Sequence, residues 1–129
     1  MKKMVIFWVL LLSLIGLTPK THAASDIDYE DLFANHQSVM LIIHPITGAI
    51  YYANQAAADF YGYPLETLLQ MNINDINMLS PDEVAAERLK ALEEERNFFI
   101  FKHRLSNGDI RTVYVYSYPV VIHGETYLY

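Results

Sequence analysis

Residues 98–118, FFIFKHRLSNGDIRTVYVYSY, decide the fold, because they read as two strands joined by a tight turn. Phe98–Leu105 and Ile110–Tyr118 are rich in aromatic and β-branched residues, which favour strands. The Asn107-Gly108 dipeptide between them is typical of hairpin turns that need φ > 0. The stretch therefore predicts an antiparallel hairpin.

The second strand of this hairpin alternates between two kinds of side chain. We expect one set to face the interior: Val113, Val115 and Ser117. We expect an aromatic set on the outer sheet face: Tyr114, Tyr116, Tyr118, Tyr127 and Tyr129. An exposed aromatic patch of that size usually marks an interface. A helix predicted over Asp26–His36, or a partner subunit, would cover this face.

Other strands surround the hairpin. Ser38–His44 is a nearly continuous apolar run, as expected of a strand buried on both faces. The turn His44–Gly48 leads into a returning strand, Ala49–Ala53. After Tyr118, His123-Gly124 makes another turn into Thr126–Tyr129. The sequence thus predicts five antiparallel strands.

Short helices and one longer helix lie between the two strand regions. Asn54 is expected to cap a helix over Gln55–Tyr61, which Gly62 ends, and Pro64 opens a second short helix. Ser80-Pro81-Asp82-Glu83 has the residues of a capping box, and its helix runs to about Arg96. Its inward stripe is predicted at Ala85, Leu89 and Leu92. Helices gathered over one face of an antiparallel sheet make an α+β domain.

Composition excludes several classes of function. The 129 residues make one domain, and 53% hydrophobic against 19% charged residues excludes wholesale disorder. Cysteine is absent, which excludes disulfide scaffolds, thiolate metal sites, thiol nucleophiles and cysteinyl-flavin adducts. The net charge of −6 argues against nucleic acid as a partner.

The N-terminus predicts export. Lys2 and Lys3 precede a 13-residue run, Val5–Leu17, and Thr21-His22-Ala23 places small residues at a cleavage site, so residues 1–23 read as a signal peptide. The mature chain, residues 24–129, would carry six basic and fifteen acidic residues, a net charge of −9. An uncleaved membrane anchor is the alternative, although a spanning helix needs about 20 apolar residues.

With the elements placed, residues 29–129 resemble a PAS domain of the S-box type, a sensory module. Residues 44–50, HPITGAI, resemble the family's Asp-Pro-x-Thr-Gly-x-Ile turn, with His44 in place of Asp. Residues 52–57 and 60–68 resemble its central helical cassette, and Asp75-Ile76 the pair before its long helix. Residues 101–113 resemble its final hairpin. The resemblance implies a PAS fold, with a five-stranded antiparallel sheet and helices over one face.

Two features differ from most relatives of this type. Most resemble cytoplasmic sensors, whereas this chain is predicted to be exported, periplasmic or facing the periplasm. The last strand ends at Tyr129, where relatives usually continue into a linker and an output domain, such as a histidine kinase or diguanylate cyclase. The chain is either the sensor part of a larger receptor or a freestanding exported protein.

Catalytic and cofactor motifs are missing. The sequence has no Gly-x-Ser-x-Gly elbow, no His-Glu-x-x-His helix and no Gly-rich phosphate loop. We therefore do not expect the protein to be an enzyme. Haem-binding relatives use a His on the long helix, which has none here. A lone strand residue, His103, is more often a hydrogen-bonded sheet residue than an axial ligand. No metal site is expected.

A small-molecule pocket between sheet and cassette is the remaining candidate. Its expected lining is Phe60, Tyr61, Met71, Ile76, Leu89, Phe99, Phe101, His103, Val113 and Val115, with polar groups from His103, Ser117 or Asn54. The alternative is that these residues are plain core. The predicted dimer contact comprises Tyr29, Leu32, Phe33, Tyr114, Tyr116 and Tyr118.

The function expected from these features is a sensory PAS module. It would bind a small molecule or a partner and relay its state through dimer packing. The alternative is a ligand-free PAS module that acts by dimerisation or docking alone.

Overall fold

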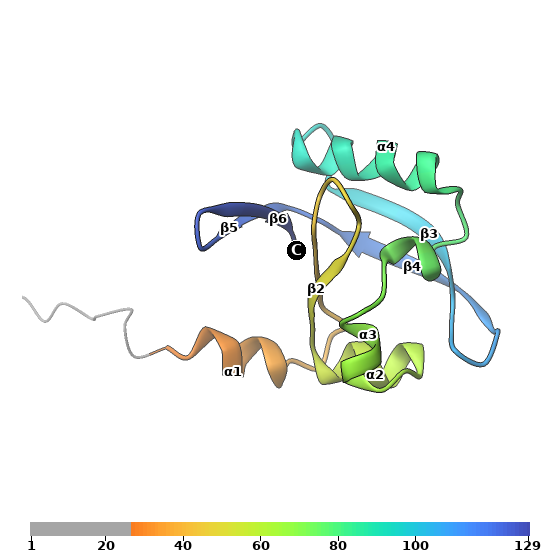
Figure 1. Ribbon diagram of the computed structural model, residues 1–129, viewed down its shortest axis with the longest axis horizontal. Helices are drawn as coiled ribbons and strands as arrows, with labels where there is room; N and C mark the ends of the chain where they lie inside the picture. The colour runs from red at the N-terminus through yellow and green to blue at the C-terminus, as the bar shows by residue number, and fades with distance from the viewer. Residues whose placement is uncertain (1–26) are drawn as a thin grey trace, which may run out of the picture.

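The structure is a computed structural model that describes residues 27–129 (Figure 1). Its elements in chain order are α1 (Tyr29–Ala34), β1 (Leu41–Ile43), β2 (Ile50–Ala53), α2 (Gln55–Tyr61), α3 (Leu65–Leu68), η2 (Ile73–Asp75), α4 (Pro81–Leu92), β3 (Phe98–Arg104), β4 (Ile110–Tyr116), β5 (Pro119–Ile122) and β6 (Glu125–Leu128). The predicted signal peptide lies outside these residues. No helix within them is long and apolar enough to cross a membrane.

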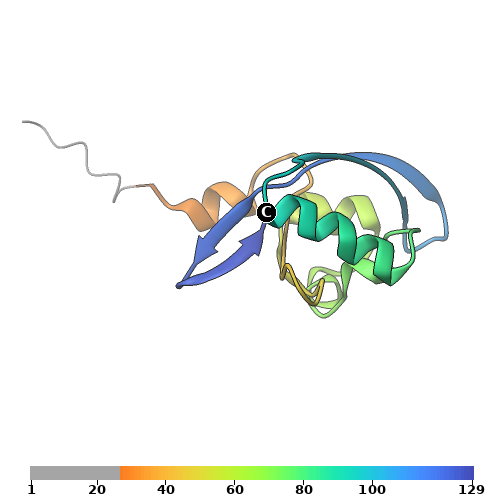
Figure 2. The same cartoon turned by 90° about the horizontal axis from the view of Figure 1, so that it is seen from above.

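The strands confirm the predicted α+β class, but they number six and pair in two groups. One group has the order β2-β1-β6-β5 and the other is the β3-β4 hairpin, and all pairs are antiparallel. Tyr118 and Tyr129 exchange two backbone hydrogen bonds of 3.0 and 2.9 Å, which extend the β5-β6 hairpin by one residue pair toward the end of β4. Figures 1 and 2 both place α4 beside the long, curved β3-β4 hairpin.

β1 is shorter and less buried than the sequence predicts. It spans Leu41–Ile43 and all three residues are half-buried. Only Ile43 pairs with β6, through Leu128. The reason for the lower burial is a cavity that lies along β1, described below.

The inward stripe of α4 differs from the prediction. Buried positions are Val84, Arg88 and Ala91, whereas Ala85 is exposed and Leu89 is 48% exposed. The capping box at Ser80 is confirmed, but the helix ends at Leu92 rather than near Arg96. The helix is rotated so that it buries the charged Arg88, which the predicted stripe does not include.

Arg88 is buried because its guanidinium binds the turn between β1 and β2. Its Nε donates to the Pro45 carbonyl and its Nη2 to the Ile46 carbonyl, both at 2.9 Å. Gly48 closes the same turn at φ +76, and an added Cβ there would lie 2.8 Å from Arg88 Nη1 and 2.8 Å from Asn72 Oδ1. The sequence anticipated the positive φ but not the arginine that fills the space.

Asn54 caps α2 as predicted and also ties down the chain before β1. Its Oδ1 accepts from the amides of Ala57 and Met40 at 3.0 and 3.1 Å. Its Nδ2 donates to the carbonyls of His36 and Ser38 at 3.0 and 2.8 Å. The Asn54 side chain is 1% exposed; its contact with Ala57 is fully buried, and the other three contacts are partly buried.

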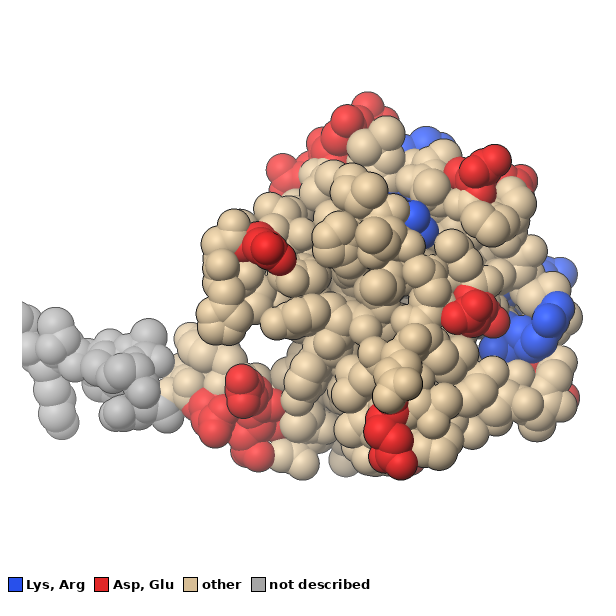
Figure 3. All heavy atoms as spheres, in the orientation of Figure 1, with Lys and Arg blue, Asp and Glu red and all other residues tan. Residues whose placement is uncertain are grey.

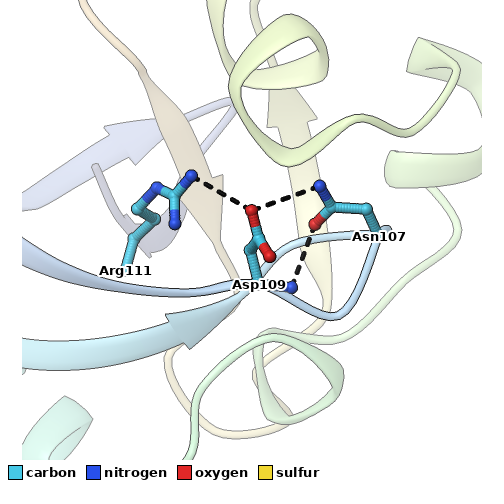
Figure 4. A network of polar contacts seen from close by, with 3 residues as sticks. All are labelled: Asn107, Asp109 and Arg111. Atoms are coloured by element: carbon cyan, nitrogen blue, oxygen red, sulfur yellow. Dashed lines mark hydrogen bonds and ion pairs between the residues drawn. The ribbon is translucent and has the colours of Figure 1, made fainter.

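The turn between β3 and β4 is stabilised by short-range polar contacts (Figure 4). Asn107 Oδ1 accepts from the Asp109 amide at 3.0 Å, and Asp109 Oδ2 accepts from Asn107 Nδ2 and Arg111 Nη2. Gly108 has φ +90, which confirms the predicted turn chemistry. The Arg111–Asp109 pair is half exposed, so it adds little stability.

Candidate ligand cavity

A cavity of about 680 Å³ lies between the strands and α4. Its walls come from β1, α2, α4, β3 and β4. Figure 3 shows a separate open gap between the β5-β6 hairpin and α1. Apolar and aromatic side chains dominate the lining: Val39, Met40, Leu41, Ile43, Phe60, Tyr61, Ile73, Val84, Ala91, Phe99, Phe101, Val113, Val115 and Leu128. A volume of this size falls in the range of small-molecule sites.

The edge of β4 that faces away from β3 borders the cavity. The Ser117 amide donates to Asn97 at the β3 side, whereas Tyr118 bonds Tyr129 on the opposite side. Because successive backbone groups alternate, those of Tyr114 and Tyr116 share the direction of Tyr118. Within residues 27–129, backbone groups of this stretch of β4 border the cavity.

The structure brings seven of the ten predicted pocket residues to this cavity: Phe60, Tyr61, Phe99, Phe101, His103, Val113 and Val115. Met71 and Ile76 belong to the solid core beneath α2, where Ile76 is fully buried. Leu89 points to solvent because α4 is rotated. Of the polar candidates, Ser117 lines the cavity, whereas the Asn54 side chain is used in backbone contacts.

Three buried polar side chains meet at one end of the cavity. Tyr61 Oη and His103 Nδ1 lie 2.8 Å apart, and His103 Nε2 lies 3.3 Å from Asn77 Nδ2. The three residues are 3%, 3% and 6% exposed. Backbone bonds at Met78–Lys102 and Arg104–Ile76 hold the two segments together. The arrangement is a polar network inside an apolar cavity.

Burial shifts the pKa of both titratable members of this network. Desolvation lowers the pKa of His103 to about 4 and raises the pKa of Tyr61 well above its usual value. Both groups are therefore neutral at physiological pH. Both His103 ring nitrogens also have side-chain neighbours, so haem ligation would require one of these contacts to break.

We expect His103 to make stability fall in mild acid. In the unfolded chain His103 titrates near the ordinary histidine pKa of 6.5, but in the fold it stays neutral down to about pH 4. The unfolded state therefore takes up the proton first, and stability present above pH 6.5 is lost as pH falls toward 4. Urea unfolding should show a loss of about 2 kcal/mol from this residue between pH 7 and pH 5.

The variant His103→Gln isolates this contribution, because the remaining titratable groups are shared with the parent. Between pH 7 and pH 5 the variant should lose about 2 kcal/mol less stability than the parent protein loses. Equal pH dependence in parent and variant would show that His103 is not held neutral by burial.

The predicted aromatic face is largely exposed. Tyr114, Tyr116 and Tyr118 are 69%, 67% and 42% exposed. Across the hairpin, Tyr116 pairs with Phe98 and Tyr114 with Ile100, and these two residues are 36% and 59% exposed. The four residues Phe98, Ile100, Tyr114 and Tyr116 are named here the hairpin patch.

Two predictions about this face are wrong in part. Tyr127 is 7% exposed, because its ring packs against Tyr51 at 4.4 Å and against His44 at 6.0 Å between centroids. α1 leaves the hairpin patch uncovered, and its Phe33 packs on Tyr52 of β2 at 4.8 Å. Tyr29 and Leu32 of α1 are 65% and 59% exposed.

Sequence reasoning missed Asn77 and Arg88. Asn77 follows the Asp75-Ile76 pair, and only its bridge to His103 reveals its role. Arg88 carried a signal in principle, since it sits three to four residues from the apolar Val84 and Ala91 on one helix face.

An antiparallel sheet, helices over one face and an apolar cavity between them define an α+β binding or interaction domain. The family model described as "PAS fold" matches residues 34–128. The chain belongs to the PAS family, which confirms the resemblance seen in its sequence motifs.

Curated relatives are diguanylate cyclases. The chain is 34% identical over 99 residues to diguanylate cyclase DgcM of Escherichia coli K12, and 35% identical over 102 residues to DgcM of strain O157:H7. These matches cover 75% of this chain and 24% of each relative. The matched region thus spans about a quarter of the relatives' length.

Solved structures support the fold. The PAS domain of a Desulfitobacterium hafniense protein gives a TM-score of 0.71 at 20% identity and covers 76% of this chain and 92% of that one. The PAS domain of an HTR-like protein from Haloarcula marismortui gives 0.69 at 21%, covering 77% and 82%. A PAS domain from a two-component sensor histidine kinase gives 0.61 at 20%, covering 76% and 85%.

Proposed function

We propose that this PAS domain senses a small molecule held in the cavity and passes its state on through dimer packing. The observation that carries the proposal is the cavity itself, about 680 Å³, lined by apolar side chains with a buried polar network at one end. A few placed polar groups in an apolar pocket are typical of ligand sites. We propose no catalytic step for the domain, and export stays a prediction from residues 1–23.

The output of the signal is proposed from the relatives. DgcM is a diguanylate cyclase, and one structural neighbour is the PAS domain of a sensor histidine kinase. We infer that the domain regulates an output of one of these two kinds, within a longer chain or in an associated protein. A ligand that prefers one packing of sheet and flanking helix would bias that output by shifting populations.

The surface proposed for dimer contact is the hairpin patch. Its four side chains adjoin one another through cross-strand pairing and stacking, with Phe98 and Tyr116 ring centroids 5.0 Å apart. A contiguous aromatic and apolar patch favours a protein partner. A second copy fits because the patch is uncharged and would face its own uncharged equivalent across a two-fold axis.

We expect Tyr116→Glu to convert a dimer into a monomer. The change would place two carboxylates at the centre of the self-associated patch, where desolvation of a charge is costly. Light scattering at matched concentrations should give a mass that falls by about half.

Ile46→Glu is the matched control, since Ile46 is 69% exposed but lies in the β1-β2 turn. This variant should remain a dimer. A Tyr116→Glu protein with the parent's dimer mass would contradict the proposed interface.

A ligand-free interaction module is the second candidate. The exposed hairpin patch favours it, because this surface needs no ligand to recognise a partner. The two candidates differ in whether the cavity holds a molecule in the purified protein.

A further inference from the structure

We propose that the Tyr61 hydroxyl donates a hydrogen bond to an acceptor atom on a mainly apolar ligand in the cavity. The inference rests on the proposed ligand-sensing function and deepens it. It names the chemistry of the ligand and the atom that recognises it. The positions of the protons in the network formed by Tyr61, His103 and Asn77 lead to it.

The orientation of the Asn77 amide is fixed from outside the network. Asn77 Oδ1 accepts from the Leu79 amide at 2.9 Å, and a backbone N–H can only donate. Turning the amide over would set two donors against each other at that contact. Asn77 Nδ2 is therefore the group that lies 3.3 Å from His103 Nε2.

This orientation selects one tautomer of His103. Because Asn77 Nδ2 is a donor, His103 Nε2 must be the unprotonated, accepting nitrogen. The ring is neutral, since burial lowers the His103 pKa to about 4. Its single proton is therefore on Nδ1.

The Nδ1 proton in turn sets the role of Tyr61. His103 Nδ1–H donates to Tyr61 Oη at 2.8 Å, so the tyrosine oxygen is the acceptor in this contact. The hydroxyl hydrogen of Tyr61 is then left to donate elsewhere, and residues 27–129 show no further acceptor for it. Tyr61 is 3% exposed and lines the cavity. An unused donor buried this deeply favours an acceptor supplied by a ligand.

The lining restricts the rest of the ligand. Most of it is apolar, so most of the ligand is expected to be apolar as well. Arg88 is the cation among the lining residues: its Nε and Nη2 donate to the carbonyls of Pro45 and Ile46, whereas its buried Nη1 has no hydrogen-bond partner among residues 27–129. The Glu87 carboxylate pairs with Lys90 and Arg96. A ketone, ether or heteroaromatic ring supplies the acceptor that the Tyr61 hydroxyl needs.

The tautomer is tested first, on the unmodified protein. Long-range ¹H–¹⁵N spectra of ¹⁵N-labelled chain distinguish a protonated from an unprotonated ring nitrogen. We expect Nδ1 of His103 to be the protonated one at pH 7. A His103 ring protonated at Nε2 would overturn the inference without requiring any variant to fold.

The donor is tested with two probes of equal shape, acetophenone and α-methylstyrene. Acetophenone has a carbonyl oxygen at the position where α-methylstyrene has a methylene group. Dissociation constants come from NMR titration of resonances that line the cavity. Replacing Tyr61 with Phe should reduce the preference for acetophenone, relative to the parent, by about fivefold, the usual worth of one hydrogen bond. Tyr63→Phe is the matched control, as this half-buried tyrosine lies outside the cavity, and should leave the preference unchanged.

The outcomes separate this inference from the proposed function. If both probes bind and Tyr61→Phe leaves their ratio unchanged, the cavity binds molecules but the Tyr61 donor is refuted. If neither probe shifts resonances of the cavity, ligand binding fails and the inference fails with it.

Discussion

Replacing Asn54 with alanine should lower the free energy of unfolding by about 3 kcal/mol, as judged from a lost cap and three further lost hydrogen bonds to the backbone. The amides of Ala57 and Met40 lose their shared acceptor, and the carbonyls of His36 and Ser38 lose their donors. Water does not readily replace the buried Ala57 contact, whereas the other three contacts are partly buried. Urea unfolding at pH 7 measures the change.

Two further variants test the reason for this loss. Asn54→Ser retains a capping oxygen but loses the amide group that donates to two carbonyls, so its destabilisation should be intermediate. Asn35→Ala removes an exposed asparagine that bonds Asp31, and should cost less than about 1 kcal/mol. An Asn54→Ala protein within about 1 kcal/mol of the parent would contradict the joint role of capping and anchoring.

Replacing Gly48 with alanine should cost about 3 kcal/mol, whereas Gly108→Ala should cost about 1 kcal/mol. Both glycines have positive φ, +76 and +90, so both variants carry backbone strain. Only at Gly48 would the new Cβ meet Arg88 Nη1 and Asn72 Oδ1 at 2.8 Å. The Cβ at position 108 meets nothing within 4 Å.

The difference between these two variants measures the close packing of Arg88 and Asn72 on the β1-β2 turn. Chemical unfolding of both proteins under one condition is sufficient. Equal destabilisation would mean that Arg88 and Asn72 move away from the new Cβ without loss.

Local chemistry made much of the fold predictable from the sequence. Short motifs predict the helix caps at Asn54, Ser80 and Gly62, because the geometry of a cap depends on only a few neighbouring residues. The Asn107-Gly108 turn likewise fixes the register of β3 and β4. These contacts need no information about distant parts of the chain.

The errors arose where distant segments decide the outcome. Arg88 is buried because two carbonyl groups more than 40 residues away in the sequence accept hydrogen bonds from its guanidinium. Tyr127 is buried because Tyr51 and His44 cover it. Strand alternation placed His103 near a pocket, but its partners Tyr61 and Asn77 come from separate segments. The periodicity of a sequence predicts which face of a helix or strand a residue occupies, but the residues that pack against it depend on the tertiary fold.

The positions of cavity and hairpin patch explain how sensing would reach a partner. The side chains of Val113 and Val115 line the cavity. Those of Tyr114 and Tyr116, which alternate with them along β4, belong to the hairpin patch. A ligand that shifts β4 would therefore move both surfaces together, because successive side chains of one strand face opposite ways. This proximity is the structural basis for the proposed relay.

The most direct test is native mass spectrometry of the full chain, with a denaturing spectrum and an absorption spectrum of the same sample. We predict a dimer whose native mass exceeds that of two chains by a reproducible amount that disappears on denaturation. Val113→Trp, which fills the cavity, should lose the excess, whereas Ile110→Trp at a 50% exposed position should retain it. Native and denatured masses that agree for the parent would contradict the ligand-sensing account and favour the ligand-free interaction module.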